Sequence, residues 1–286
     1  MRPILTRDEW ITRRAAPYLE DLDNQHKTCH LDDAITLCHY LNGEMNAKSA
    51  ARLITTMVRE EAIRREVTME PFDTIFGTPI AIRRIMLLLA DSLWRFVQER
   101  EMILDLIIAI QDLPPDGTIH WHELPRFNRI WLTCYNEQLS MTDGKDVAFF
   151  KKAGNLEATM YLRGIPVSED DEYPYGVINL VSLEWKTFEF EIHMVHEWLK
   201  VAGLKLAKNL QPAHVKALTR AVRGRRGKTY MIQITMYEHW EHWKKRFLQV
   251  SHDENFLSTE SRQVAKHCHE IMKGLVVKQP DPPTEE

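Results

Sequence analysis

The longest regular pattern of apolar and polar positions in the chain runs from residue 80 to residue 113. Ile82, Ile85, Leu89 and Ile103 belong to an apolar face whose members recur mostly every three or four residues. That period is typical of a helix with one buried face, so we expect a central core helix here. Charged residues interrupt the pattern too often for a membrane span, which needs about 20 apolar residues.

One charged residue, Arg100, falls on the apolar face of this expected helix. Either the helix breaks near residues 98–101 and turns Arg100 to solvent, or the arginine points inward. An inward guanidinium cannot lose its proton, so it would have to pair with a carboxylate or line a wet or ligand-filled cavity. We favour the break, because Glu99 and Glu101 beside it are also costly to bury.

A second pattern begins at Val181 and alternates spacings of four and three residues. Such a narrow apolar seam predicts a helix that packs lengthwise on another helix. The seam consists of Val181, Trp185, Phe188, Ile192, Val195, Leu199, Ala202 and Leu206. We expect its partner to be either the helix at 80–113 or the helix that contains Trp240.

Shorter helical patterns fill most of the remaining chain. We expect them at residues 8–18, 32–42, 46–66, 125–139, 146–162, 213–222, 236–250 and 258–275. Only residues 118–121 and 176–180 are candidates for extended structure. The sequence therefore predicts an all-α fold, an irregular multi-helix bundle of about ten helices with no significant sheet. The low glycine content, 11 of 286 residues, favours the same class.

The best candidate for a boundary in the chain lies between residues 164 and 181, where prolines, glycines and acidic residues gather. We expect residues 1–275 to form a single helical domain, with two packed helical layers meeting near this stretch as the alternative. The polar, proline-rich tail at residues 276–286 cannot build a core, so we expect it to be disordered.

Composition and charge restrict the classes of partner. A formal net charge of −4 gives no overall attraction for phosphate backbones or anionic lipid, so we expect neither nucleic acid nor a membrane as partner. The opening sequence MRPILTRDEW has charges where a signal peptide needs its apolar core. The four cysteines are widely spaced and form no C-x-x-C pair, which favours buried thiols. We therefore expect a cytoplasmic protein.

Three motifs rich in aromatic residues occur between residues 121 and 243. They are a W-x-x-L-P-x-F segment that begins at Trp121, the segment FFKKAGNLEATMYLRG that begins at Phe149, and a W-x-x-W pair at Trp240 and Trp243. Together they resemble a family of uncharacterised all-helical fungal proteins, a fungal domain of unknown function. The resemblance covers residues 72–275. It implies a helical, intracellular protein of fungal origin, and it carries no established activity and no site residues.

Two histidine pairs have the residue types of a metal site. His193 and His196, with glutamates nearby, have the separation of two ligands on one helical face. Helical geometry, however, places this group opposite the apolar seam, so we expect a solvated stripe and no metal ion. His120 and His122 lack an evident third ligand. We also expect no cofactor, because no nucleotide-binding motif occurs.

The segment EHWEHWKKRF places His239 at the edge of a buried stripe, beside Trp240. We favour a histidine held by a backbone carbonyl or a carboxylate over a catalytic one. His239 is nevertheless the first candidate for general acid or base chemistry. Arg100, Trp121, His239 and Trp240 are the candidates for ligand binding, because aromatic walls with a few polar groups are typical of small-molecule sites.

The sequence contains eight tryptophans and many packing signals but no complete catalytic motif. The function that this combination favours is an intracellular helical binding or interaction module for a protein partner or a small apolar ligand. The alternative is an enzyme without a recognised motif, which would act on an apolar small molecule in an aromatic-lined cavity between helices. The sequence leaves both open.

Overall fold

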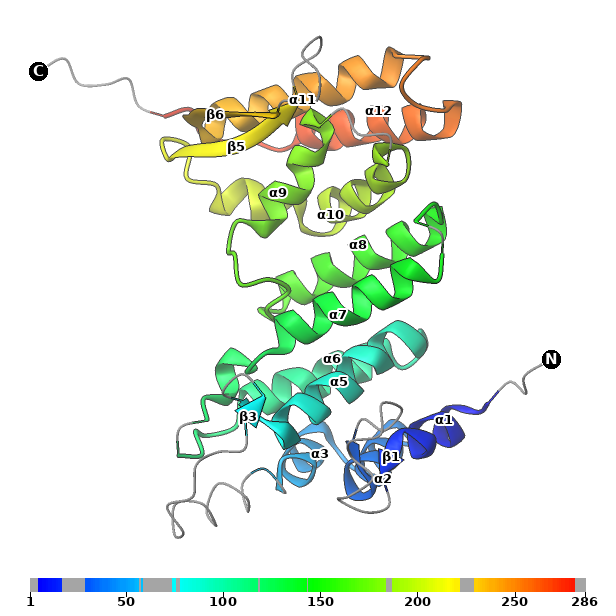
Figure 1. Cartoon of the computed structure of the whole chain (residues 1–286). Coiled ribbons are helices and arrows are strands. Elements are labelled where there is room, and N and C mark those ends of the chain that lie inside the picture. Colours follow the sequence, from blue (N-terminus) through cyan, green and yellow to red (C-terminus); the bar gives the residue numbers. More distant parts are fainter. Residues whose placement is uncertain are drawn as a thin grey trace, which may run out of the picture. The chain divides into compact units, whose positions relative to one another are not determined.

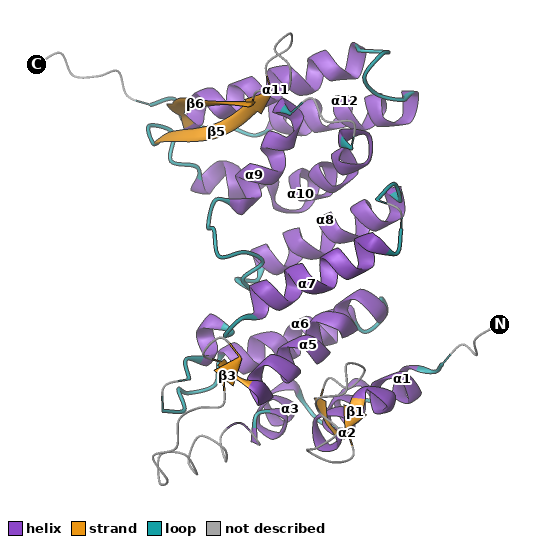
Figure 2. Cartoon of the chain, viewed as in Figure 1, coloured by secondary structure: helices purple, strands orange, loops and turns teal. Residues whose placement is uncertain are grey.

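The computed structural model describes residues 5–16, 29–56, 58, 74–75, 78–117, 119–142, 144–183, 187–221 and 229–280. Most residues in these ranges are helical (Figures 1 and 2), which confirms the predicted all-α class. The chain divides into two compact units, one of Met1–Tyr135 with Ile165–Val167 and one of Asn136–Gly164 with Ser168–Glu286. None of the helices in the described ranges is long and apolar enough to cross a membrane.

The first unit is built from helices around a core of aliphatic and aromatic side chains. Its helices are α1 (Arg7–Arg14), α2 (Leu31–Leu41), α3 (Ala47–Ile54), α5 (Ile80–Arg95), α6 (Arg100–Gln111), the 3-10 helix η2 (Trp121–Glu123) and the first part of α7 (Phe127–Ser140). Two-residue strands pair as β1 (Ala15–Ala16) with β2 (Cys29–His30) and as β3 (Thr74–Ile75) with β4 (Thr78–Pro79). The predicted continuation of the third helix from residue 59 to residue 66 lies outside the described residues.

The expected central helix at 80–113 is two helices, α5 and α6, which contact each other. The break at residues 96–99 is the arrangement that the charged residues favoured. Glu99 directly precedes α6 with φ −94° and ψ 6°, so Arg100 is the first residue of the new helix. The apolar face is buried on both sides of the break, at Ile85 and Leu89 in α5 and at Ile103 in α6.

The second unit is a bundle of longer helices with one β-hairpin. It contains α8 (Val147–Leu162), α9 (Tyr173–Asn179), the 3-10 helix η3 (Leu180–Ser182), α10 (Phe188–Asn209), β5 (Val215–Ala221), β6 (Thr229–Thr235), α11 (Met236–His252) and α12 (Thr259–Gly274). Helix α10 packs on α8 and on α12, and α12 packs on α11. Helix α10 is therefore the centre of this unit.

The predicted seam is buried on α10, from Phe188 through Ile192 and Leu199 to Leu206. Trp185 lies outside the described residues, and Val181 belongs to η3, so α10 begins later than predicted. The predicted partner within this unit was wrong, because α10 packs chiefly on α8 and α12 instead of the helix that contains Trp240.

The predicted helix at 213–222 is wrong. Residues Val215–Ala221 form strand β5, which pairs antiparallel with β6 from Val215 opposite Thr235 to Ala221 opposite Thr229. Strand β6 contains two threonines and two isoleucines and β5 contains one valine and one threonine, and these β-branched residues favour strands when a partner strand is present. The piece expected to be extended at 118–121 is confirmed only in part, because Ile119 forms an isolated antiparallel bridge with Asp116 and His120 is extended, but Trp121 begins η2 and residue 118 lies outside the described residues. The piece expected at 176–180 is wrong, because it lies in α9 and η3. Each sheet in the described part of the chain has only two strands.

Candidate functional site

The four residues predicted for ligand binding lie in different units. Arg100 and Trp121 belong to the first unit, whereas His239 and Trp240 belong to the second. Neither unit by itself therefore brings all four side chains together.

Arg100 is half-buried at the start of α6. Its Nε atom is shielded from solvent and has no hydrogen-bond partner among the described residues. Burial lowers the pKa of Arg100, and the nearby Glu101 carboxylate raises it. The guanidinium is therefore neither turned fully to solvent nor held in a buried ion pair, and it keeps unused donor capacity.

Trp121 is fully buried, and its Nε1 atom donates to Asp116 Oδ2 at 3.1 Å. The turn that follows contains two non-glycine residues with positive φ, Leu124 at 45° and Arg126 at 66°. Side chains rarely adopt this conformation without support from the surrounding structure. Trp121 therefore anchors a strained turn before α7, and it packs in the core instead of lining an open site.

His239 has no exposed surface, and its Nε2 atom lies 3.0 Å from the backbone carbonyl oxygen of Lys216. Its ring stacks on Trp243 at 5.7 Å between centroids, and Trp243 in turn meets Trp240 edge to face at 6.3 Å. The backbone-carbonyl alternative is thus the one that the structure shows. His239 fastens α11 to β5, and Trp240 is buried with it.

The predicted solvated stripe on α10 is wrong at His193, whose side chain is 1% exposed. His196 is also partly buried, with 21% of its side chain exposed. The reason is that α10 is covered on more than one side, by α8 and by α12, so the apolar seam is not its only buried face. Within the described residues, no three histidine, cysteine or acidic side chains are placed to hold a metal ion.

His193 belongs to a polar cluster that the sequence did not reveal. We call it the α12 cap cluster, and it consists of Glu189, His193, Ser258 and Ser261. The Glu189 carboxylate accepts from the Ser258 N–H at 2.9 Å, from the Ser258 hydroxyl at 2.5 Å and from the Ser261 hydroxyl at 2.9 Å. The Ser258 hydroxyl oxygen caps α12 by accepting from the Ser261 N–H, and the carboxylate from α10 holds both serines at this end of the helix, where negative charge is favourable.

The chemistry available to the α12 cap cluster is limited. His193 Nε2 lies 3.5 Å from the Ser261 hydroxyl oxygen, but both side chains are almost fully buried. The carboxylate of Glu189 contacts the serine instead of the imidazole, so it does not orient the histidine as a base for a serine nucleophile. Burial and the Lys151 charge lower the pKa of His193, which favours the neutral ring.

A second buried polar group of the second unit is Glu157 on α8, which is 2% exposed. Its Oε2 atom accepts from the Tyr173 hydroxyl at 3.1 Å and from Trp198 Nε1 at 3.2 Å. The rings of Tyr173 and Tyr161 lie 6.3 Å and 5.6 Å from the Trp198 ring, which is direct contact. These groups form a packed contact between α8, α9 and α10. The sequence signal that could have indicated this contact is the glutamate inside the apolar pattern of residues 146–162.

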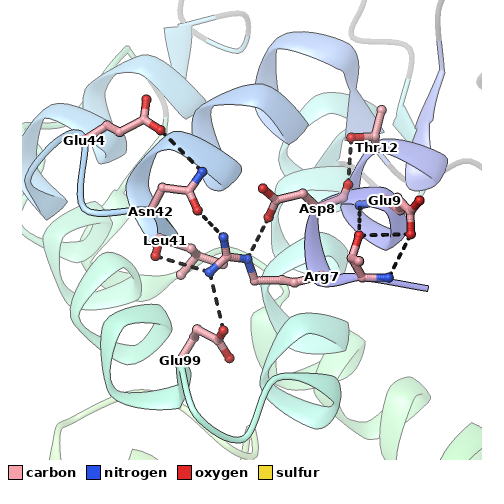
Figure 3. Close-up of polar contacts among 9 residues, drawn as sticks. Arg7, Asp8, Glu9, Thr12, Leu41, Asn42, Glu44 and Glu99 are labelled. Carbon is pink, nitrogen blue, oxygen red and sulfur yellow. Dashed lines mark hydrogen bonds and ion pairs between the residues drawn. The ribbon is translucent and has the colours of Figure 1, made fainter. Parts of the chain in front are cut away.

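In the first unit, Arg7 joins three elements (Figure 3). Its guanidinium contacts the Asp8 carboxylate at 2.7 Å, the Glu99 carboxylate at 3.4 Å, the Leu41 carbonyl at 3.3 Å and the Asn42 amide oxygen. Leu41 and Asn42 end α2, and Glu99 precedes α6. Arg7 thus uses its planar set of donors to hold α1, the end of α2 and the α5–α6 turn, and this engaged guanidinium is no free anion site.

The outer side of α2 carries two exposed apolar residues one helical turn apart. Leu31 is 40% exposed and Ile35 is 42% exposed, while the opposite side of the helix is buried at Leu37 and Leu41. Asp32 and His39 are exposed on the same side as Leu31 and Ile35. We call Leu31, Asp32, Ile35 and His39 the α2 outer face.

Comparison with protein-family models, with curated proteins and with solved structures finds no match to this chain. The resemblance to a fungal helical family therefore stays a prediction.

Proposed function

We propose that this chain is a helical interaction module and that the α2 outer face binds a partner protein. The observation that carries the proposal is the exposure of Leu31 and Ile35, at 40% and 42%, on a single side of one helix. Apolar anchors one turn apart are how an amphipathic helix and a complementary groove or helix recognise each other. Partners of this kind need only a few buried anchors to bind firmly.

Charge indicates what the partner would carry. Asp32 lies beside the apolar pair, and Glu44, with 52% of its side chain exposed, follows the helix and contacts His39. An apolar helix or peptide with basic residues at its edges would complement this surface, because opposite charges at the rim favour encounter and fix orientation. We therefore expect a partner segment with an apolar stripe flanked by lysine or arginine.

The rival proposal, an enzyme acting on an apolar small molecule, has less to support it. Its first candidate base, His239, is buried and has its Nε2 atom engaged by the Lys216 carbonyl. Its other polar candidate, Arg100, has free donor capacity but is half-buried and lies in the other unit. If a small apolar molecule co-purified with the protein in a stoichiometric amount, that result would favour the enzyme over the interaction module.

A photo-reactive phenylalanine analogue placed at Ile35 tests the proposal in cells. We expect a discrete adduct with another protein, and no such adduct from the same analogue at Leu248, which is 40% exposed on α11. Adding Leu31→Lys should remove the adduct and weaken binding of the purified partner at least roughly tenfold, which corresponds to about 1.4 kcal/mol. Adducts only within the chain itself, or equal adducts from both positions, would overturn the proposal.

A further inference from the structure

The joint between α10 and α12 contains a buried group whose charge can change near neutral pH. His193 is 1% exposed, and its Nδ1 atom has no hydrogen-bond partner among the described residues. Its Nε2 atom faces Ser261 of α12 at 3.5 Å. A neutral imidazole needs one donor and one acceptor partner, whereas an imidazolium needs two acceptors and has to be desolvated as an ion.

We propose that α10 and α12 form an acid-sensitive joint, in which protonation of His193 releases the N-terminal part of α12 from α10. The N-terminal end of α12 is held beside His193, since the hydroxyls of Ser258 and Ser261 both donate to Glu189, which lies one helical turn before His193 on α10. Any movement of α10 that gives a charged His193 access to water therefore also breaks the hydrogen bonds from Ser258, the N-cap of α12, and from Ser261 to Glu189.

The charged groups around His193 come from three helices. Lys151 of α8 and His196 of α10 oppose its protonation, whereas Glu260 of α12 and Glu189 of α10 favour it. Burial outweighs these charges, and the pKa of His193 lies below 6.5, its value outside the fold. A base with a lowered pKa in the folded state contributes stability above that unfolded value, and the contribution is lost as the pH falls below it.

Two other groups on α10 help to define the effect. Burial also lowers the pKa of His196, so this half-buried ring adds a contribution of the same sign. Glu191 acts in the opposite direction, because burial raises the pKa of its carboxyl and acid then favours its folded form. A loss of α12 protection on acidification therefore cannot come from Glu191.

Hydrogen exchange of the full chain measures the release of α12. Between about pH 7.5 and about pH 5, after correction for intrinsic exchange, the protection of α12 should fall on the order of tenfold, more than that of the first unit. In His193→Gln and His193→Phe this fall should largely disappear, while it should persist in His252→Gln. The control residue His252 is an exposed histidine at the end of α11.

Titration of the His193 ring by nuclear magnetic resonance of the unmodified protein tests the proposal even if the substitutions unfold the chain. We expect the ring to protonate below pH 6.5, together with the loss of α12 protection. A ring that protonates at or above the ordinary value, or α12 protection that is unchanged across the acid range, would overturn the proposal. An equal acid response in the two His193 variants would overturn it as well.

Discussion

Asp33 illustrates how far burial alone shifts the charge of one side chain. It is 2% exposed at the start of α2, where its carboxylate accepts from the His30 N–H at 3.2 Å. Burial raises the pKa of Asp33 to about 7, and Asp32 adds to the rise, while the His30 N–H and Arg84 oppose it. The folded state therefore prefers the protonated acid over the pH range between the usual value of 3.8 and about 7.

The sign of this shift leads to the first prediction. Because the folded pKa exceeds the unfolded one, Asp33 contributes stability at low pH and loses it as the pH rises through about 7. Asp33→Asn keeps an acceptor for His30 and removes the charge, so it should stabilise the protein at pH 8 by roughly 1 to 4 kcal/mol and have little effect near pH 4. Urea unfolding at both pH values measures this, with Asp32→Asn as the control. The prediction would be refuted if the free energy of unfolding changed with pH in the same way in Asp33→Asn and in the unsubstituted protein.

Arg7 supports a second prediction at this scale. In Arg7→Lys the charge remains, but one ammonium cannot reach Asp8, Glu99 and the end of α2 at the same time. We expect a loss of roughly 1 to 3 kcal/mol in the free energy of unfolding, as for other charged hydrogen bonds. Thermal or urea denaturation gives the value. Arg52→Lys on the exposed side of α3 should change little, and an equally small effect at Arg7 would mean that its contacts do not stabilise the unit.

Among the elements, the helices were predictable from apolar periodicity, and the exceptions have physical causes. The α5–α6 break was indicated by the charged residues at 99–101, because charged residues interrupt a buried face. Strand β5 was missed because its apolar spacing also fits a helix, and only the pairing with β6 decides between them. The burial of His193 was missed because one helix can be covered on two sides, which the seam of α10 does not reveal.

The contact between α8 and α10 supports a prediction about whole elements. A Cβ atom added at Gly154 would lie 2.5 Å from the backbone oxygen of Met194, so the two helices would have to separate. Gly154→Ala should therefore cost about 1 to 3 kcal/mol, as overpacked positions do, despite the better helix propensity of alanine. Gly176 lies in α9 with no atom within 4 Å of an added Cβ. Gly176→Ala should instead stabilise the protein by about 0.5 to 1 kcal/mol.

Chemical denaturation of the two glycine variants compares them directly. The two positions share a helical setting and differ in the approach of a neighbouring backbone. If both alanines stabilise the protein, α8 and α10 are not as close as the structure has them. If both destabilise it, the effect is not specific to this helix crossing.

At the scale of the whole molecule, the sequence predicted the helical class but not the assembly of a site. The class follows from local periods that each helix carries by itself. The roles of the candidate residues do not follow from such local periods. Trp121 and His239 were chosen for their chemistry, but both are buried packing residues, with hydrogen bonds to Asp116 and to the Lys216 carbonyl. The α12 cap cluster joins residues 69 positions apart, from Glu189 to Ser258. A single sequence gives no signal for such distant pairs.

The division into two units leads to the last prediction. The second unit has its own core around α10, with Trp198, Trp240 and Trp243 buried inside it. A fragment of residues 136–286 contains this whole unit and adds only Ile165–Val167 from the first unit. A core of this kind allows a domain to fold alone, so this fragment should give a helical circular dichroism spectrum and a cooperative urea transition. Gly154→Ala should then destabilise the fragment by the same amount as the full chain, because its neighbours all lie within the unit. A fragment with helical signal but no cooperative transition would show that the two units stabilise each other.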